Sequence, residues 1–330
     1  MIPKVYIGNL LKDKKSYLPI LYPNLGRQHK PDRLFLDKAY DVLSEPVVDI
    51  VDDPNQSDYF LLPYDFFNVE KFSEYLRDFS ELARKHNKQI IIFDFSDFDK
   101  EIRIPNSLIF RVSIYKNKKR SNEIVMPPFV ENLSQIPVRD KDDKDSEPTV
   151  GFNGYAKFSF RNLLPLGAHR QGLYFRRKAM RLLEQASGIK TNFISRSSYA
   201  GHRDTIGMDP EVARHEYLEN IRNSDFVLSP KGDGNYSIRF YETLALGRIP
   251  ILIDTDNVLP LEDEIDYEKF IIRVDYRNIN SFARIVKEKY ESMSNDEFVA
   301  MQERAREAFE NYLRMDRFLS RAFAKFFRFK

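Results

Sequence analysis

A glycine-rich turn in the second half of the chain contains the residue types best suited to chemistry. The turn spans residues 230–236, between an apolar run at residues 226–229 and a helical pattern that begins near Ser237, a good N-cap residue. Gly232 and Gly234 would let the backbone approach an anion, and the free N–H groups at a helix start favour negative charge. The spacing therefore predicts an anion-binding site.

Two charged residues of the following helix extend this prediction. Arg239 lies in the first helical turn, where its forked guanidinium could clamp a phosphate. Glu242 follows three residues later on the same helix face, and its carboxylate could accept hydrogen bonds from ribose hydroxyls. Phosphate and ribose binding at one helix end suggest a nucleotide.

These residues allow three interpretations. The turn could be an ordinary strand–turn–helix connection in which the glycines serve only tight geometry. The pattern Gly232-x-Gly234-x-x-Ser237 also resembles the dinucleotide fingerprint, and Asp254 follows about 20 residues later as that fingerprint expects, although serine replaces its third glycine. The third interpretation is a sugar-nucleotide site.

The elements that must position this turn follow from the hydrophobic pattern. Strands are expected at residues 5–8, 47–51, 59–63, 89–93, 108–112, 149–152, 191–194, 226–229, 250–253 and 270–274. Helices are expected at residues 31–43, 69–85, 174–187, 210–220, 237–246 and 279–292, and in a long segment from residue 296. The alternation of strands and helices predicts an α/β protein with parallel sheets.

A charged segment at residues 139–148 divides the pattern into two halves. Seven consecutive charged residues cannot be buried cheaply, so the segment is either a linker between domains or a surface loop within one domain. We favour the linker, because a new strand begins directly after it. Two doubly wound domains that face each other would bind a ligand between them, outside the carboxyl ends of their strands.

Residues 224–274 resemble the exostosin family of glycosyltransferases. The resemblance is carried by a Pro-basic-Gly-acidic-Gly turn at residues 230–234 and a Ser-x-Arg-x-x-Glu helix at residues 237–242. A Gly-x-Ile-Pro strand start at residues 247–250 and an acidic–Leu-Pro segment at residues 256–260 follow in the same order. Residues 53–64 and 124–128 add a weaker similarity upstream.

The resemblance implies a GT-B architecture, in which two Rossmann-like domains face a central cleft. Residues 1–145 would form the acceptor-binding domain and residues 146–305 the nucleotide-sugar-binding domain. Residues 306–330 would form a helix that returns to the N-terminal domain. It also implies inverting transfer from a UDP-sugar donor to an oligosaccharide or lipid-linked glycan in polysaccharide biosynthesis. The family's Gly-Arg-Asp-His element is not evident, which leaves the acceptor open.

The donor nucleotide is expected to contact residues of the glycine-rich turn, of the first strand of the second domain and of two basic segments. The expected residues are Asn153, Gly154, Arg170, Arg203, Lys231, Gly232, Gly234, Asn235, Ser237, Arg239 and Glu242. Arg170 belongs to a basic cluster at residues 170–178 that could instead be a solvated helix face. Two rival functions stay open: an NAD(P)-dependent oxidoreductase, and a non-catalytic member that binds a sugar nucleotide.

The general base of an inverting transfer should lie at the carboxyl end of a strand in the N-terminal domain. We select Asp65, which follows the strand expected at residues 59–63; Asp94, Asp97 and His29 are the alternatives. Each of these carboxylates could instead be an exposed loop residue or a helix N-cap.

A metal site is possible at the motif Asp254-Thr255-Asp256, which ends an expected strand. We favour a simple strand-end loop, and we expect neither a metal nor another cofactor. The helix start and nearby arginine or lysine side chains would then stabilise the leaving diphosphate.

The C-terminal segment carries a basic stripe and an apolar stripe at helical spacing. The basic residues are Arg314, Arg317, Arg321, Lys325 and Arg328, and the apolar ones are Met315, Leu319, Phe323 and Phe326. We favour packing of the apolar face on the N-terminal domain. The alternative is peripheral contact with an anionic membrane.

The composition excludes several classes of protein. The chain has no cysteine, which excludes disulfide scaffolds, thiolate metal sites and a cysteine nucleophile. Its 52 Lys and Arg residues and 50 Asp and Glu residues leave a net charge of +2, so no nucleic-acid partner is expected. No apolar run approaches the ~20 residues of a membrane-spanning helix, and we expect a cytoplasmic protein.

Overall fold

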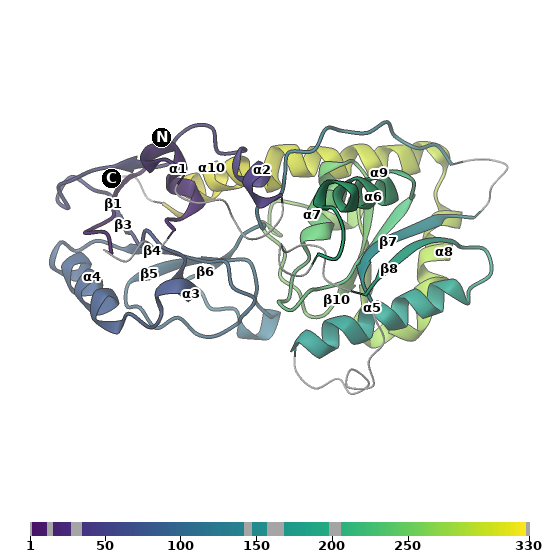
Figure 1. Cartoon of the computed structure of the whole chain (residues 1–330), viewed down its shortest axis with the longest axis horizontal. Coiled ribbons are helices and arrows are strands. Elements are labelled where there is room, and N and C mark those ends of the chain that lie inside the picture. Colours follow the sequence, from purple (N-terminus) through teal and green to yellow (C-terminus); the bar gives the residue numbers. More distant parts are fainter. Residues whose placement is uncertain are drawn as a thin grey trace.

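Two parallel β-sheets, one in each half of the chain, form the framework of the molecule (Figure 1). The computed structural model describes residues 2–11, 16–27, 35–141, 147–156, 168–197 and 206–327, without the side chains of residues 168–170. The strand pairs of both sheets are parallel throughout the described residues. This is the GT-B arrangement that the family resemblance implies, and the expected fold class is confirmed.

The N-terminal domain contains a six-stranded sheet with the order β2-β1-β3-β4-β5-β6. Its strands are β1 (Lys4–Tyr6), β2 (Asp49–Ile50), β3 (Tyr59–Leu61), β4 (Ile90–Asp94), β5 (Ser107–Arg111) and β6 (Glu123–Val125). The helices of this half are α1 (Tyr22–Leu25), α2 (Leu36–Tyr40), α3 (Phe66–Val69) and α4 (Ser73–Lys85). Strand β4 is buried along its whole length, as its unbroken apolar run predicts.

The C-terminal domain contains a five-stranded sheet with the order β11-β10-β9-β7-β8. Its strands are β7 (Thr149–Tyr155), β8 (Lys190–Arg196), β9 (Phe226–Ser229), β10 (Ile249–Asp254) and β11 (Ile272–Asp275). The helices are α5 (Ala168–Glu184), α6 (Pro210–Arg222), α7 (Ile238–Ala245), α8 (Phe282–Ser292), α9 (Asn295–Ala308) and α10 (Met315–Phe326). Each strand expected from the sequence overlaps one of the observed strands of the two sheets.

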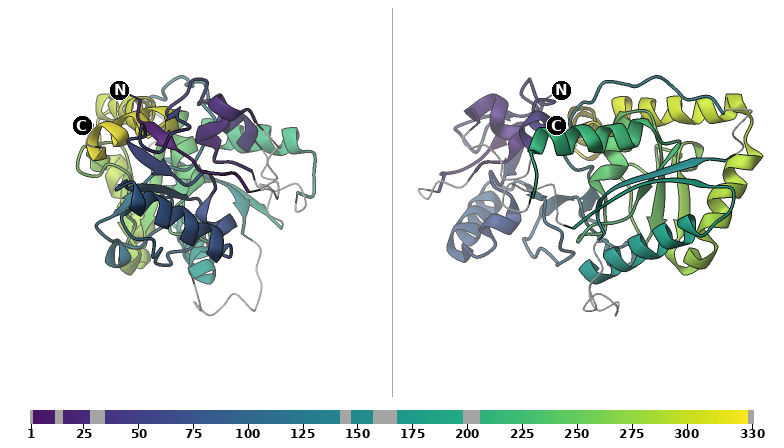
Figure 2. Two further views of the ribbon diagram at one scale, coloured as in Figure 1. Left: turned by 90° about the vertical axis from the view of Figure 1, so that its left-hand side faces the viewer. Right: turned by 45° about the vertical axis from the view of Figure 1, so that its right-hand side comes forward.

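The long helix expected from residue 296 is broken in two. Helix α9 begins with a capping box between Ser294 and Glu297, and a π-helical turn, Phe309–Leu313, separates it from α10. Arg314 after this turn is extended, with φ −64° and ψ 133°. The break lets α10 leave the C-terminal domain and cross to the N-terminal one, as the yellow helices in Figures 1 and 2 show.

Helix α10 packs its aromatic face on the sheet of the N-terminal domain. The rings of Phe318 and Phe323 lie edge-on to Phe110 of β5, with centroids 6.4 and 6.1 Å from it. Lys325 forms ion pairs with Asp263 and Glu264 on the other side of the helix. The apolar face of α10 therefore packs on the N-terminal domain, as we favoured. The ion pairs of Lys325 reduce the positive charge with which this helix could bind an anionic membrane.

None of the helices among the residues that the structure describes is both long and apolar enough to span a lipid bilayer.

Replacing Phe323 with alanine should lower the free energy of unfolding by about 3–5 kcal/mol, because the ring is 3% exposed and its removal leaves a cavity. Urea denaturation followed by circular dichroism measures this loss. Phe326→Ala is the matched control, since that ring lies on the same helix but is 37% exposed. Equal losses in the two variants would contradict the packing described for α10.

Candidate functional site

A cavity of about 510 Å³ lies between the two domains. Helix α2, Asp97 and residues 129–131 line it from one side. The carboxyl ends of β7, β8 and β9 line it from the other, together with α5, α6 and the start of α7. This is where open parallel sheets usually bind ligands, so we take the cavity as the candidate active site.

Arg239 projects into the cavity from the first turn of α7. Its Nη2 donates a hydrogen bond to the backbone oxygen of Asn153 at 2.7 Å, and the guanidinium carbon lies 4.3 Å from the ring centroid of Phe152. A Cβ added at Gly154 would lie 2.7 Å from the same Nη2. Glycine at 154 therefore makes room for the guanidinium, so that three of the expected donor residues meet at one point.

Glu242 lies one helical turn further along α7 and is held from two sides. Its Oε1 accepts a hydrogen bond from Arg214 and its Oε2 accepts one from Tyr217, both at 2.6 Å. The second arm of the Arg214 guanidinium forms an ion pair with Glu131 at 2.9 Å. Burial, and then the Glu242 carboxylate, raises the pKa of Tyr217 well above its usual value, so the phenol stays a donor and the carboxylate has a fixed orientation.

Two further arginines line the cavity. Arg176 belongs to the basic cluster at residues 170–178, whereas Arg196 was not expected at the donor. Arg176 of α5 donates to the backbone oxygen of Tyr155 at 2.6 Å. Arg196, at the end of β8, donates from Nε to the side chain of Asn153 at 2.9 Å. Arg196 lies two residues after the strand expected at residues 191–194, and this position at a strand end is the signal by which it could have been found. With Arg214 and Arg239, these side chains place four guanidinium groups on one wall of the cavity. Arg196 and Arg214 are paired there with Glu216 and Glu242, both at 2.6 Å.

The glycine-rich turn is divided between two roles. Gly232 and Ser237 line the cavity, and the Ser237 side chain makes no capping hydrogen bond to α7. Gly234 lies instead against the N-terminal domain, where an added Cβ would be 2.8 Å from Asp97 Oδ1 and 2.9 Å from Ser113 Oγ. The close approach of Asp97 and Ser113 of the N-terminal domain, and of the Tyr236 ring in the same turn, requires glycine at 234.

Lys231 also differs from the expectation. Its ammonium group is buried outside the cavity lining and donates to the hydroxyl of Tyr115 at 2.8 Å. Burial lowers the pKa of Lys231 to about 8. In this structure Lys231 therefore makes a contact between the two domains.

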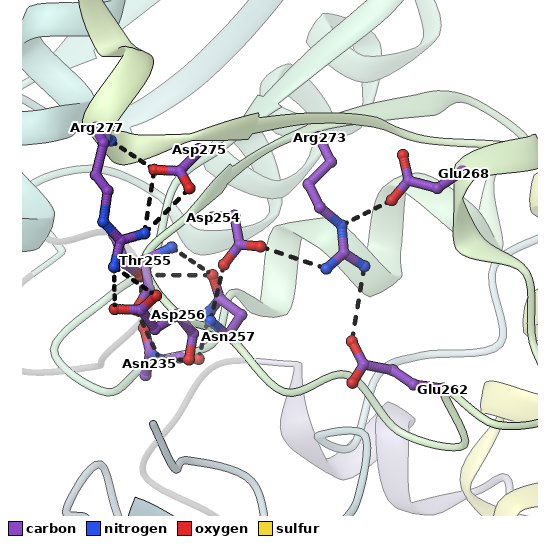
Figure 3. Close-up of polar contacts among 10 residues, drawn as sticks. All are labelled: Asn235, Asp254, Thr255, Asp256, Asn257, Glu262, Glu268, Arg273, Asp275 and Arg277. Carbon is purple, nitrogen blue, oxygen red and sulfur yellow. Dashed lines mark hydrogen bonds and ion pairs between the residues drawn. The ribbon is translucent and has the colours of Figure 1, made fainter. Parts of the chain in front are cut away.

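Asn235 is a buried connection between the domains and does not line the cavity. Its backbone N–H donates to Ser113 Oγ at 2.9 Å and its Nδ2 donates to the backbone oxygen of Ile114 at 3.2 Å. Its Oδ1 accepts from Thr255, and its backbone oxygen accepts from Asn257, at 2.6 and 2.7 Å (Figure 3). These bonds use the polar groups of Asn235, which therefore holds the two domains together.

The motif Asp254-Thr255-Asp256 forms a strand-end loop whose two carboxylates are neutralised by arginines (Figure 3). Asp254 accepts from the backbone N–H of Asn257 at 2.8 Å and forms an ion pair with Arg273 at 3.3 Å. Asp256 forms an ion pair with Arg277 at 3.0 Å. Within the described part of the chain, no group of three or more His, Asp or Glu side chains gathers in a way that could hold a metal ion.

Asp65, the expected base, does not line the cavity. Its carboxylate caps α3 by accepting from the backbone N–H of Phe67 at 3.4 Å, and it also accepts from the N–H of Phe95 at 3.1 Å. Burial is the main reason why the pKa of Asp65 is raised to about 7. Asp94 is bound to Arg111 at 2.8 Å, whereas Asp97 does line the cavity. Of the candidate bases among the described residues, Asp97 is thus the one that lines the cavity.

Arg203 and the alternative base His29 lie outside the described residues, and so does the side chain of Arg170.

Comparison with known proteins identifies a family. The family model described as the Exostosin GT47 domain matches residues 2–289. The chain is 35% identical over 104 residues to an exostosin-1 homologue of Caenorhabditis elegans, a match that covers 32% of this chain and 26% of the relative. It is 32% identical over 102 residues to exostosin-1 of Drosophila melanogaster, covering 31% and 13%. The matches thus span about a quarter or less of these two relatives.

Solved structures show only weak similarity. TarM has a TM-score of 0.42 at 11% identity, with coverage of 82% of this chain and 55% of the other. HepE of Anabaena, solved in complex with UDP-glucose, has a TM-score of 0.43 at 9% identity, with coverage of 98% and 99%.

Between pH 5 and pH 8, the free energy of unfolding should fall less in Asp65→Asn than in the wild type. The difference should be on the order of 1–2 kcal/mol. The folded protein keeps the Asp65 proton up to a pKa of about 7, whereas the unfolded chain loses it near its ordinary value of 3.8. The wild type therefore loses stability as the pH rises through this window, and asparagine does not titrate.

Urea denaturation at the two pH values measures this difference, with the exposed Asp78→Asn variant as control. Parallel pH profiles of wild type and Asp65→Asn would contradict the burial of this carboxylic acid.

Proposed function

Because the chain belongs to the exostosin GT47 family of glycosyltransferases, we propose that it transfers a sugar from a UDP-sugar to a glycan or glycoconjugate acceptor, with inversion at the anomeric carbon. The observation that carries the proposal is the face of α7 in the interdomain cavity. There Arg239 and Glu242 lie one helical turn apart, beside the free N–H groups of the helix start.

Three arginines of the cavity wall suit the diphosphate of such a donor. Arg176, Arg196 and Arg239 approach it from α5, β8 and α7, three different elements of the C-terminal domain. Guanidinium groups bind phosphate oxygens in forked pairs, and in a cavity with little water they stabilise the charge that develops as UDP leaves. We propose that they replace a metal ion, since Asp254 and Asp256 are already neutralised by arginines.

The ribose is proposed to bind at Glu242. Each of its oxygens accepts one hydrogen bond, from Arg214 or from Tyr217, and a carboxylate oxygen can accept two. The unused positions can accept bonds from the ribose hydroxyls. Since Arg214 and Tyr217 fix the carboxylate before the donor arrives, little side-chain order has to be gained on binding.

Asp97 is proposed as the general base, in place of Asp65. It reaches the cavity from the N-terminal domain, and its Oδ1 would lie 2.8 Å from a Cβ added at Gly234. In the proposed step the acceptor oxygen attacks the anomeric carbon, its proton passes to the Asp97 carboxylate, and the bond from that carbon to UDP breaks. Attack from the face opposite UDP gives inversion. The other lining carboxylate on this side, Glu131, is engaged by Arg214.

The oxidoreductase alternative receives no support from the site. Asp254, which a dinucleotide fingerprint would use to bind ribose, does not line the cavity and is paired with Arg273.

Arg239→Ala should weaken UDP binding by about 10- to 100-fold, because it removes a charged pair of donors from the diphosphate site. Thermal-shift and calorimetric titrations with UDP, UDP-sugars and NAD measure this. A ligand at 100 times its Kd should stabilise the wild type by about 2.7 kcal/mol. Arg284→Ala is the control, since Arg284 is exposed on α8 and pairs only with Glu288 among its described contacts.

Binding of NAD in preference to UDP would overturn the transferase proposal. Wild-type UDP affinity in Arg239→Ala would overturn the assignment of the donor site.

Asp97→Asn should lower kcat by about 10²- to 10⁴-fold, with UDP affinity unchanged, because the amide cannot take the proton of the acceptor. Release of UDP in the presence of donor and acceptor measures the rate. Asp99→Asn serves as the matched control, since Asp99 lies in the same loop but pairs with Lys118 at 2.7 Å. Full activity of Asp97→Asn would exclude it as the base.

A further inference from the structure

Two exposed phenylalanine rings form an aromatic patch on the N-terminal domain. Phe67 on α3 and Phe98 in the loop after β4 are 45% and 49% exposed. Their ring centroids lie 5.5 Å apart with an angle of 31° between the planes. Among the described residues only one other phenylalanine, Phe326, is at least 36% exposed. A pair of adjoining rings kept in solvent often marks a binding surface.

The aromatic patch is held on a rigid support. The carboxylate of Asp65 accepts from the backbone N–H of Phe67 and from that of Phe95, so it connects the two segments that carry the rings. Arg111, which is 1% exposed, donates to the backbone oxygens of Phe98 and Lys100 at 3.0 and 3.1 Å. The exposure of the rings therefore does not come from a loosely held loop.

The buried guanidinium of Arg111 is itself fixed by two carboxylates. Asp94 and Glu123 accept from it at 2.8 and 2.7 Å, and both are buried. The loop that carries Phe98 is thus anchored to β5, β6 and the end of β4.

The position of the aromatic patch connects it to the site. Phe98 directly follows Asp97, the carboxylate that lines the cavity from the N-terminal domain. Both rings belong to segments that follow the carboxyl ends of β3 and β4, the side of the sheet where ligands bind in this type of fold. Lys100 lies beside them, with its Nζ 5.4 Å from the Phe98 centroid and 3.8 Å from Glu70. The rings thus have a polar rim.

We propose that Phe67 and Phe98 form an acceptor subsite on which a pyranose unit of the acceptor glycan stacks. The C–H face of a pyranose with equatorial hydroxyls is apolar and flat, whereas its edge carries hydroxyl groups. The rings would cover the apolar face, and Lys100 and Glu70 would bond to the hydroxyls. The next sugar unit would then reach Asp97. This inference rests on the proposed function, because it assigns the acceptor of that same reaction.

A tryptophan reporter tests the subsite without any need for turnover. The chain has no tryptophan, so Phe98→Trp introduces a single indole at the aromatic patch. Titration of this variant with cellohexaose, xylohexaose and chitohexaose should shift its emission in a saturable way with at least one of them. The same titration of Phe326→Trp, on α10, should show no shift.

Second substitutions separate stacking from general apolar contact. Adding Phe67→Ala to the Phe98→Trp variant should weaken oligosaccharide binding about tenfold. In an acceptor titration of the transfer reaction, Phe98→Leu should raise the acceptor KM while UDP affinity and melting temperature stay unchanged, since leucine keeps the apolar area but not the flat ring. Unchanged oligosaccharide affinity after Phe67→Ala would overturn the subsite.

The outcomes distinguish this inference from the proposed donor site. UDP binding combined with no emission shift for any of the three oligosaccharides would overturn the subsite and leave the donor site intact. An emission shift in a protein that does not bind UDP would support the subsite and overturn the proposed donor.

Discussion

The structure of the site depends on the pairing of one buried carboxylate, Glu242, with Arg214. A buried charge is stable only when it is paired and hydrogen-bonded, and Glu242 has both Arg214 and Tyr217 as partners. Arg214 extends the pairing to Glu131, on the side of the cavity that adjoins the N-terminal domain. Loss of Arg214 would leave the charge of Glu242 uncompensated. The pairing therefore holds α6 and α7 together and orders this part of the cavity wall before any ligand binds.

The glycine-rich turn shows how a short motif can serve two surfaces at once. Gly232 faces the cavity, while Gly234 and Asn235 face Ser113 of the opposite domain. The turn thus sets the distance between the domains and lines the space between them. A substitution at 234 would act on domain contact first and on ligand binding only as a consequence, whereas a substitution at 239 would act on the ligand directly.

Asp65 and Asp97 illustrate why a perturbed pKa does not by itself identify a catalytic group. The pKa of Asp65 is raised to about 7, which would suit a general base, yet its carboxylate caps α3 and lies away from the cavity. Burial alone explains most of that shift. Its contribution is to hold two loops together, and one of them carries Asp97. Geometry therefore has to be considered before acidity when the two carboxylates are compared.

The sequence alone determined the local features, because these depend on neighbours along the chain. Apolar runs such as that of β4 predicted the strands, and the spacing of Arg239 and Glu242 placed both on one face of a helix that a glycine turn precedes. The motif at residues 230–260 also identified the family. Only the tertiary structure decided that Asn235 connects the domains, that Asp97 and not Asp65 reaches the cavity, and that Arg196 and Arg214 join its wall. These residues are far apart in sequence, and their roles follow from how two sheets and α10 pack against one another, which no local periodicity encodes.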